Sequence, residues 1–520
     1  MNNKPYTIKE YERAHQPHFE QLYRSWFTGH FHMQPEAVDE FVLKDPEAAI
    51  LEKGGAILVA LHEDRIAGFV ALKKVDSNTH ELTKMIIREE YRGQGLGETL
   101  CKAAIDKALD LGTHRVVLYS HSSLGAALNL YRKLGFNEVL LEPGVYSPFR
   151  CDIKMELTAH LPIPIHKAIH SRISEVDWDH LELGLYTSDH MLISDYSGSQ
   201  WQTAEIRPFG PFSLSPTTLA LHYGQTIFEG MKAFRMEDGR VQIFRPDKHY
   251  ERLVRSAQRL CMPVVPAELF REGLRRLVGL DQEWVPGQAG SALYIRPFII
   301  ATETRLTAKV SNSYRFAVIC TPAGPYYAQP LRMKVECTFV RAAKGGTGYA
   351  KCGGNYGASL YPTQKANDEG YDQVLWTDGR EHRYIEESGT MNIFFVIRDK
   401  LVTPPLTDSI LDGVTRDSLL TLAAGAGITV EERSVSVEEL KKGFENGQVS
   451  EAFGAGTAAV ISPIQAIGID GRDYHLPVVA RVRGADAMGN TQSVALRLKE
   501  ALDDIRYGKK ADPYGWNFIV

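Results

Sequence analysis

Apolar and polar positions alternate along the first part of the chain in a way that predicts interleaved strands and helices. Residues 81–88 (ELTKMIIR) predict a strand, and the following segment (EEYRGQGLG) predicts a glycine-rich turn that opens a helix. The apolar positions of that helix recur at steps of three or four: Leu96, Leu100, Ala104, Ala108 and Leu111. Gly112 stands where a left-handed C-terminal cap belongs. A strand (HRVVLYS), an amphipathic helix (AALNLYRKLGF) and a final strand are expected to follow.

Further along the chain, two Asp-Gly pairs between apolar runs predict β-hairpins, at residues 238–239 and 378–379. The strand that returns from the second hairpin carries Glu386 and Glu387. Because neighbouring residues of a strand face opposite sides, one of these two carboxylates is expected to point inward. A buried carboxylate needs a cationic partner, so we expect a positive charge beside it.

Two proline-rich stretches mark the boundaries between domains. In residues 157–174 (LTAHLPIPIHKAIHSRIS), Pro162 and Pro164 disfavour a helix and predict a semi-rigid linker. A softer break lies at residues 321–332, where three prolines separate two strand-like runs. A chain of 520 residues suggests roughly three domains. We therefore expect a first domain, a linker and two further domains at residues 1–158, 159–174, 175–325 and 326–520.

Composition and charge favour small-molecule chemistry. The chain is 44% hydrophobic and 24% charged, as globular proteins are, and its net charge of −5 provides no basic field for nucleic acid or an anionic membrane. Its six cysteines lie far apart without a CxxC pair, which argues against a zinc site or a disulfide framework. We expect no metal, no membrane segment and a location in the cytoplasm.

The glycine turn of the first domain predicts an anion site. A strand, a glycine turn and a helix N-terminus in this order expose the backbone N–H groups from Gln94 to Gly97, and the helix dipole adds positive potential. A diphosphate is the expected guest. The glycine spacing is not GxGxxG, and no Gly-Lys-Ser/Thr follows, so neither a dinucleotide fold nor a nucleoside-triphosphate loop is indicated.

Two motifs identify this domain more closely. The pattern R-x-x-G-x-G is met by Arg92, Gly95 and Gly97, and the pattern A-x-x-L-Y-x-K-x-G-F is met over residues 127–136. On these motifs, residues 5–157 resemble the GCN5-related N-acetyltransferase (GNAT) family. The resemblance implies direct acetyl transfer to an amine, with Tyr131 as the acid for the departing thiolate. It also implies that acetyl-CoA is held at Arg92, Gln94, Gly95, Leu96 and Gly97.

The acetyl acceptor and the base that deprotonates it stay open. Glu81, Glu89 and a water chain are alternatives for the base. Many members of the family have Asn at the position of Leu124, so this chain departs from the pattern there. An alternative of another class is a regulatory module that binds acetyl-CoA or an amino acid and transfers nothing.

Lys351 is the chemical focus of the second part. It lies in GGTGYAKCGGNYGASL, where six of the thirteen residues from 345 to 357 are glycine. A flexible surface loop is one interpretation of so much glycine. The other is that backbone approaches a bound group closely and holds the amine against it as a nucleophile.

Other features of the second part favour the interpretation of Lys351 as a nucleophile. The segment DKHYERLVRSAQRL predicts a helix with Arg252 and Arg255 on one face, and the glycine turn FGAGTAAVISP places Thr457 to meet an anion. An amine, an inward acid, an arginine and two anion turns fit pyridoxal 5′-phosphate. The aldehyde of this cofactor needs a lysine, and its ring nitrogen needs a carboxylate. Its phosphate needs positive charges and backbone N–H donors.

Residues 175–520 resemble the branched-chain amino acid aminotransferases of the type IV pyridoxal-phosphate fold. The segments LHYGQTIFEGMKAF, YIRP, KCGGNYGASL, EESGTMN, LDGVTRDSLL and YGWNFIV follow that family in order. The resemblance implies Lys351 as the residue that bonds the cofactor and moves the substrate's α-proton, Glu387 at the ring nitrogen and Tyr356 on the ring hydroxyl. Around the phosphate it implies Arg252, Val414, Thr415 and Thr457. As walls of the substrate pocket it implies Tyr223, Tyr294, Tyr356 and Thr390.

The resemblance also implies Arg296 as the partner of glutamate's distal carboxylate, steadied by Gln373. Ala459 and Ser462 stand where vertebrate members have a CxxC, so thiol-based redox control is not expected there. D-amino acid aminotransferase and aminodeoxychorismate lyase are the alternatives within the same fold.

The combined expectation is an α/β and α+β multidomain enzyme. A GNAT mixed β-sheet flanked by helices comes first, and a two-domain type IV aminotransferase follows. The aminotransferase is expected to convert leucine, isoleucine or valine with 2-oxoglutarate into branched 2-oxo acids and glutamate, with ping-pong kinetics. By resemblance we expect a homodimer with its active sites near the subunit interface.

Overall fold

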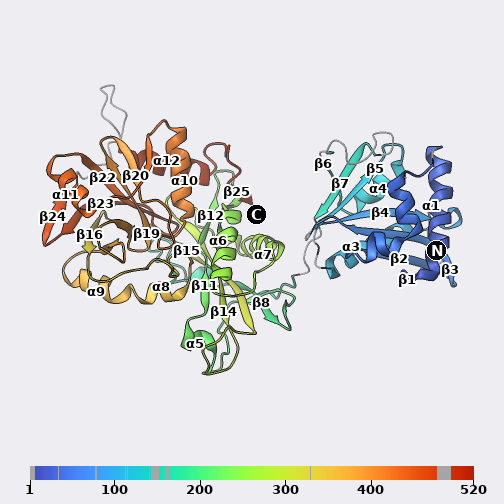
Figure 1. The fold of residues 1–520 in the computed structure, drawn as a ribbon, viewed down its shortest axis with the longest axis horizontal. Coiled ribbons are helices and arrows are strands. Elements are labelled where there is room, and N and C mark those ends of the chain that lie inside the picture. The colour runs from blue at the N-terminus through green and yellow to red at the C-terminus, as the bar shows by residue number, and fades with distance from the viewer. Residues whose placement is uncertain are drawn as a thin grey trace. The chain divides into compact units, whose positions relative to one another are not determined.

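The computed structural model describes residues 6–32, 34–76, 79–111, 113, 115–139, 141, 151–158, 163–327, 329–476 and 493–520. The chain divides into two compact units, residues 1–161 and 162–520 (Figure 1). The boundary falls inside the expected linker. The predicted cap at Gly112 and linker residues 159–162 lie outside the described residues. In the part of the chain that the structure describes, no helix is long and apolar enough to cross a membrane.

The described part of the first unit contains one seven-stranded sheet in the order β1-β2-β3-β4-β5-β7-β6. Only β4 and β5 run parallel to each other. The strands are β1 (Thr7–Glu10), β2 (Ala56–His62), β3 (Arg65–Lys74), β4 (Thr79–Ile87), β5 (Arg115–Ser120), β6 (Asn137–Val139) and β7 (Ile153–Thr158).

Helices cover both faces of this sheet. The α3 and α4 side chains join one apolar core with Leu58 and Ala60, whereas the α1 side chains join the opposite core with Ile57 and Val59. This alternation along β2 is what a strand buried on both faces requires. The helices are α1 (Gln16–Phe31), α2 (Ala37–Lys44), α3 (Leu96–Asp110) and α4 (Gly125–Lys133), with single turns at Arg13–His15, Glu47–Leu51 and Glu89–Tyr91.

The second unit begins with an antiparallel sheet in the order β10-β8-β15-β14-β12-β13-β25, in which β9 also pairs with β8 and β11 also pairs with β14. Its strands are β8 (His190–Ser197), β9 (Gln200–Trp201), β10 (Glu205–Pro208), β11 (Thr226–Phe228), β12 (Met231–Arg235), β13 (Val241–Phe244), β14 (Ala292–Ala301), β15 (Tyr314–Ala323) and β25 (Asn517–Ile519). The helices with it are α5 (Leu219–Tyr223), α6 (Pro246–Arg259) and α7 (Ala267–Leu280), with turns at Ile173–Glu175 and Gln282–Trp284.

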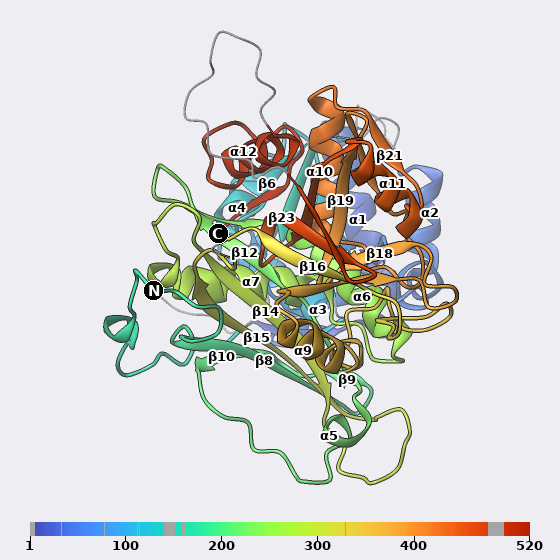
Figure 2. The ribbon, with the colours of Figure 1, turned by 90° about the vertical axis from the view of Figure 1, so that its left-hand side faces the viewer.

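A second sheet of the same unit has the order β18-β17-β16-β23-β22-β19-β20-β21, with β24 paired to β23 and a further pairing of β18 to β19. Its strands are β16 (Leu331–Glu336), β17 (Gln373–Thr377), β18 (Ile385–Ser388), β19 (Met391–Ile397), β20 (Lys400–Thr403), β21 (Val430–Glu432), β22 (Val449–Gly456), β23 (Val460–Ile469) and β24 (Arg472–His475). The helices are α8 (Gly353–Gly357), α9 (Leu360–Asp368), α10 (Val414–Gly425), α11 (Val437–Glu445) and α12 (Val494–Arg506). In Figure 2, α10 and α12 lie side by side against this sheet and share one apolar core with it.

Both predicted hairpins are present, because β12 pairs with β13 and β17 pairs with β18, each antiparallel. The C-terminal strand β25 pairs with β13. The last residues therefore belong to the first sheet of this unit, and the expected domain 326–520 does not hold together up to its end. Ile165 bridges to Ile206, which attaches the described end of the linker segment to the second unit.

Candidate functional site

Lys351 is held between three elements of the second unit. Its backbone N–H donates to Ser256 Oγ of α6 at 2.9 Å, and its carbonyl accepts from the Phe228 N–H of β11 at 3.0 Å. Its Nζ donates to the Tyr356 hydroxyl at 2.8 Å and lies 4.8 Å from the centroid of the Phe228 ring. The amine therefore has a defined position against an aromatic wall and a hydroxyl, which a loose surface loop does not provide.

Glu387 is the inward carboxylate of the pair that the strand pattern singled out. It is 3% exposed, accepts from the Leu411 N–H at 2.6 Å through Oε1, and pairs through Oε2 with Arg341 Nε at 3.0 Å. Burial raises the pKa of Glu387, while Arg341, the Leu411 N–H and Lys351 act in the opposite direction. Its strand neighbour Glu386 accepts from Ser409 Oγ at 2.5 Å instead.

Arg252 lies at the centre of a fully buried charge cluster. Its Nε and Nη2 donate to the two oxygens of Glu229 at 2.7 and 2.8 Å, and the His249 ring contacts Glu229 Oε2 at 2.8 Å. Burial alone would raise the pKa of Glu229, but Arg252 and His249 outweigh burial and hold the pKa below its usual range. Hydrogen bonds to the ionised Glu229 carboxylate therefore hold the Arg252 side chain in place.

The segment before α10 connects these groups. The Leu411 N–H meets Glu387, the Asp412 carbonyl accepts from Arg252 Nη1 at 2.9 Å, and the Asp412 carboxylate accepts from Arg255 at 2.7 Å. Arg252 and Arg255 thus share one helix face, as predicted. At Gly413 a side chain would meet Asn392 Oδ1 at 1.9 Å, so only glycine fits at this helix start.

The first residues of α10, Val414 and Thr415, are buried beside that glycine. The N-terminus of a helix with free N–H groups next to a buried arginine is suited to a phosphate. Thr457 lies in the turn between β22 and β23, where the neighbouring Ala458 carbonyl accepts from Lys232 Nζ at 2.8 Å.

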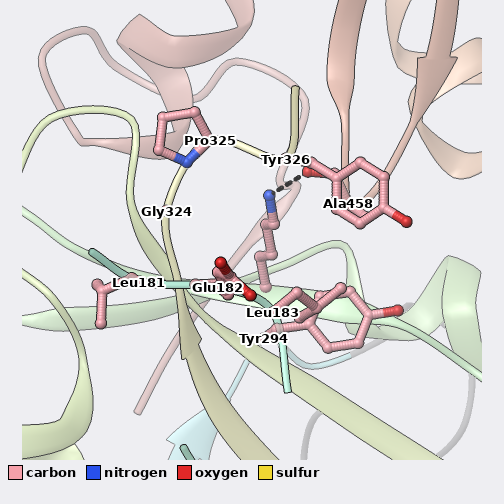
Figure 3. A pocket seen from close by; sticks show the side chains of 10 residues that line it. Leu181, Glu182, Leu183, Tyr294, Gly324, Pro325, Tyr326 and Ala458 are labelled. Atoms are coloured by element: carbon pink, nitrogen blue, oxygen red, sulfur yellow. Dashed lines mark hydrogen bonds between the residues drawn. The ribbon is translucent and has the colours of Figure 1, made fainter. Parts of the chain in front are cut away.

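A cavity of about 350 Å³ opens between the two sheets of the second unit, a size that suits a small ligand. Figure 3 shows Tyr294, Tyr326 and Ala458 around it, with the dashed bond from the Lys232 ammonium to the Ala458 carbonyl. Lys232 is 5% exposed, and burial, followed by the charge of Arg506, lowers its pKa to about 7. The lining residues are Leu181, Glu182, Leu183, Lys232, Tyr294, Ala323, Gly324, Pro325, Tyr326 and Ala458.

A second, smaller cavity lies beside Glu387, and Tyr356 and Thr390 line it together with Arg341. Phe228 bridges the region between the two cavities. Its ring contacts Tyr356 at 5.0 Å, and the Arg296 guanidinium lies 4.7 Å from its centroid. Lys351, Tyr356, Glu387 and Thr390 are therefore brought together.

Arg296, Gln373 and Tyr223 lie in different parts of the second unit. Arg296 stacks on Phe228 and Tyr294 and donates to the Tyr294 hydroxyl at 3.1 Å. Gln373 begins β17 of the other sheet and lies against Gly389 and Tyr327, and no hydrogen bond between it and Arg296 is found among the described residues. Tyr223 is 44% exposed at the end of α5 and contacts only its neighbour His222 among the described rings.

In the first unit, β4 and β5 pair only from Thr79 to Glu81, although β4 continues to Ile87 and β5 to Ser120. The two strands therefore part beyond Glu81. The glycine turn follows at the end of β4. Gly95, with a φ of 82°, caps α3, and its neighbour Gly97 lies so close to Leu130 and Ile87 that a side chain would crowd them at 3.2 and 3.3 Å.

Arg92 and Gln94 shape this turn from within. Arg92 Nε donates to the Ile87 carbonyl at 3.1 Å, and Gln94 Nε2 donates to the Glu90 carbonyl at 2.7 Å. The backbone N–H groups of Gln94, Gly95, Leu96 and Gly97 have no hydrogen-bond partner among the residues that the structure describes. A 15-residue helix that starts with such open donors is suited to a diphosphate.

Tyr131 of α4 is buried in the core that α3 and α4 share. Burial, and then the neighbouring Cys101, raise the pKa of its hydroxyl. Because its pKa is raised, the hydroxyl keeps its proton at neutral pH, and within the described residues no hydrogen bond to it is found. Glu81, one of the open candidates for the base, lies where β4 and β5 still pair and is nearly buried.

The sequence interpretation missed Arg341, Glu229 and Lys232. Each is a charged residue buried beside a predicted one. Arg341 stands four residues before the glycine-rich stretch that holds Lys351, and Glu229 and Lys232 stand in FEGMKAF, which served only as a family motif. A charge inside an otherwise apolar strand, such as Lys232 in β12, was the available signal.

The amino-transferase class IV family model matches residues 226–467, and the acetyltransferase (GNAT) family model matches residues 17–136. The "branched-chain-amino-acid transaminase 1" of Bacillus subtilis is 44% identical over 345 residues, which are 65% of this chain and 94% of that protein.

Solved structures agree in fold. A branched-chain aminotransferase from Thermoproteus uzoniensis, solved with norvaline, is 27% identical with a TM-score of 0.51, and covers 64% of this chain and 99% of its own. The branched-chain amino acid aminotransferase of Escherichia coli is 26% identical with a TM-score of 0.50, and covers 63% of this chain and 98% of its own.

Proposed function

The chain belongs to the family of branched-chain amino acid aminotransferases and carries a GNAT-family domain before its aminotransferase part, and on this premise we propose that Lys351 is its transaminating residue. The substrates are leucine, isoleucine or valine on one side and 2-oxoglutarate on the other. The observation that carries the proposal is the contact between Lys351 Nζ and the Tyr356 hydroxyl, close to the buried carboxylate of Glu387. The test is transamination by the protein and its Lys351 variant, as developed in the Discussion.

The residues present fit pyridoxal 5′-phosphate, the cofactor that the family implies. Arg252, held by Glu229, and the start of α10 at Val414 and Thr415 provide a cation and backbone donors for its phosphate. Thr457 would complete this set from the facing turn. When bound, the cofactor supplies a ring that accepts the electron pair left when the substrate loses its α-proton.

Lys351 then has two tasks, to bond the cofactor and to carry a proton. Its Nζ has the Tyr356 hydroxyl at 2.8 Å, so a proton at Nζ can be shared with a neighbour that both donates and accepts. Glu387 would face the ring nitrogen, and Thr390 lines the cavity beside it. The Phe228 wall keeps water from one side of the amine.

The cavity with Lys232 and Tyr294 is our proposed place for the substrate's α-carboxylate, which both amino acid and 2-oxo acid carry. A buried ammonium that donates to the Ala458 carbonyl retains two further donors. Arg296, on the same sheet face, remains the proposed partner of the distal carboxylate of glutamate. Charge-assisted bonds of this kind contribute about 1.5–3 kcal/mol each.

Lys232 gives this pocket a pH dependence. Because its pKa is lowered to about 7, Lys232 is charged below that pH and loses its proton above it. We expect kcat/KM for 2-oxoglutarate to fall as the pH rises through about 7, since this ratio reports the free enzyme. Lys232→Met should remove that limb and lower kcat/KM at acid pH by about 10- to 100-fold.

Lys499→Met is the control for this profile. Lys499 lowers the pKa of Lys232 from a distance but does not line the cavity. The control variant should keep the limb, moved slightly to higher pH. An unchanged limb in Lys232→Met would mean that another group titrates there.

We propose that Tyr223 completes the substrate pocket of a partner subunit. Within one chain it is exposed, and so are Leu221, Leu306 and Val310, large apolar side chains that a homodimer would cover. A homodimer in the cytoplasm, with six free cysteines kept reduced, fits these features.

For the first unit we propose acetyl transfer from acetyl-CoA to an amine. The open N–H groups at the start of α3 support binding of the diphosphate, and the parting of β4 from β5 supports a slot for the rest of the molecule. Tyr131, with its raised pKa, would give its proton to the departing thiolate.

Tyr131→Phe is expected to lower the release of coenzyme A by about 10²-fold, the usual scale of one general acid. The measurement is thiol release from acetyl-CoA across a panel of amino acids and amines. Tyr11→Phe, which alters a buried tyrosine in the core on the opposite face of the sheet, is the matched control and should leave the rate unchanged.

The regulatory alternative predicts a different result. If acetyl-CoA changes the aminotransferase kinetics while no member of the panel becomes acetylated, the first unit senses acetyl-CoA and transfers nothing. Equal rates for Tyr131→Phe and the unsubstituted protein would remove Tyr131 from the mechanism.

A further inference from the structure

Arg341 is a buried cation that contacts Glu387 and has no role in the proposed binding of the cofactor or the substrate. Its side chain is 10% exposed, and its Nε lies 3.0 Å from Glu387 Oε2. The same guanidinium donates to the Ser409 carbonyl and, at 3.3 Å, to the Gly348 carbonyl. Arg341 therefore joins the stretch before Lys351, the segment before α10 and the strand that carries Glu387.

The surroundings of Glu387 make its charge depend on this arginine. The carboxylate is 3% exposed, and its hydrogen bond among the described residues comes from the uncharged Leu411 N–H. A carboxylate in such a place takes up a proton unless a cation stands beside it. Arg341 is the cation in contact, whereas Lys351 acts on Glu387 from further away.

The other groups around this cavity do not replace Arg341. Glu386, on the same strand, is an acid that burial also drives toward its protonated form, and it is engaged by Ser409. Tyr356 and Thr390, which line the cavity with Glu387, carry no positive charge. Without Arg341, the carboxyl groups of Glu386 and Glu387 would lie close together, and Lys351 would be the nearest positive charge.

We propose that Arg341 is a positioning residue that keeps Glu387 ionised, so that the ring nitrogen of bound pyridoxal 5′-phosphate holds the proton between them. The proposal rests on the proposed function, since it presumes that Glu387 faces that ring. No bond other than N–H or O–H is involved. With Arg341 present the proton resides on the ring nitrogen, and without it the same proton moves to the Glu387 oxygen.

The experiment loads the full-length protein with pyridoxal 5′-phosphate labelled with ¹⁵N in its ring and records the ¹⁵N shift of the ring. We expect the protonated shift in the unsubstituted protein and a change toward the unprotonated shift in Arg341→Gln. The rate of the leucine half-reaction should fall with it by about 10²-fold, because a neutral ring accepts electrons less well. The spectroscopic readout is one that a structural role alone would not move.

Two further variants make the result decisive. Arg341→Lys keeps the charge but loses the Nη2 group that donates to the Ser409 and Gly348 carbonyls. It should keep the protonated shift even if Arg341→Gln fails to fold. Arg506→Gln removes another buried arginine, which pairs with Asp503 far from Glu387 in sequence, and should leave the shift unchanged. A protonated ring in folded Arg341→Gln, or an unprotonated ring in Arg341→Lys, would overturn the inference.

A failure of the proposed function and a failure of the role of Arg341 give different results. If the unsubstituted protein does not take up the labelled cofactor, the proposed function fails and this inference with it. If the protein takes it up and Arg341→Gln keeps the protonated shift, only the role of Arg341 is wrong.

Discussion

Lys351→Ala is expected to lower the transamination of leucine with 2-oxoglutarate by about 10⁴-fold or more, since both the bond to the cofactor and the proton carrier are lost. The fold should persist, because the contacts that place residue 351 with Ser256 and Phe228 are made by its backbone. The measurement is leucine consumption under steady state, with circular dichroism as the check on folding.

Lys344→Ala is the matched control for this experiment. Lys344 directly precedes the same glycine-rich stretch but is exposed, so its loss should leave the rate within a factor of about two. A Lys351→Ala protein that converted leucine at the original rate would rule out the assigned chemistry.

Arg252→Met is expected to have the second largest effect, and it should act on stability and cofactor retention together. It leaves Glu229 buried with only a hydrogen bond to His249, whose pKa burial lowers, and this costs about 3–5 kcal/mol of unfolding free energy. It also removes the cation proposed for the phosphate. Thermal unfolding and the pyridoxal 5′-phosphate content after gel filtration measure the two effects.

The double variant Glu229→Gln with Arg252→Met separates the effect on stability from the effect on cofactor retention. Because it removes both charges of the pair, it should recover part of the stability that the single variant loses. It should not recover the cofactor, since the phosphate still lacks its arginine. Retention of the cofactor by either variant at the level of the unsubstituted protein would contradict the place of the phosphate.

Local physical chemistry explains what the sequence could predict. The turn before Leu96 was predictable because only a glycine adopts the φ of 82° found at Gly95 so readily. That one of Glu386 and Glu387 points inward followed from the two-residue period of a strand, while the choice of Glu387 came from the family resemblance. The hairpins followed from their Asp-Gly turns. Each of these features depends on residues that are neighbours along the chain.

Long-range contacts explain what the sequence could not predict. Lys232 meets Ala458 across a separation of 226 residues, and Arg341 meets Glu387 of β18 although α8, α9 and β17 lie between them in the chain. A periodic pattern predicts which face is buried but not which charged residue is buried opposite it. The same limit applies to β25, whose pairing with β13 joins residues far apart in the chain.

The place of Tyr223 in the pocket stays a prediction. A motif match assigns a residue to a pocket without stating which copy of a chain supplies it, and within one chain Tyr223 is exposed. Arg296 stays a prediction for the distal carboxylate, and its described hydrogen-bond partner is Tyr294 on the same strand, two residues away.

The most direct measurement of the central claim is borohydride reduction of the purified protein followed by peptide mapping. The account predicts a yellow protein that loses its visible absorbance on reduction, with the reduced cofactor attached to one peptide, through Lys351. A protein without visible absorbance before reduction, or a cofactor mass on a different lysine, would contradict it.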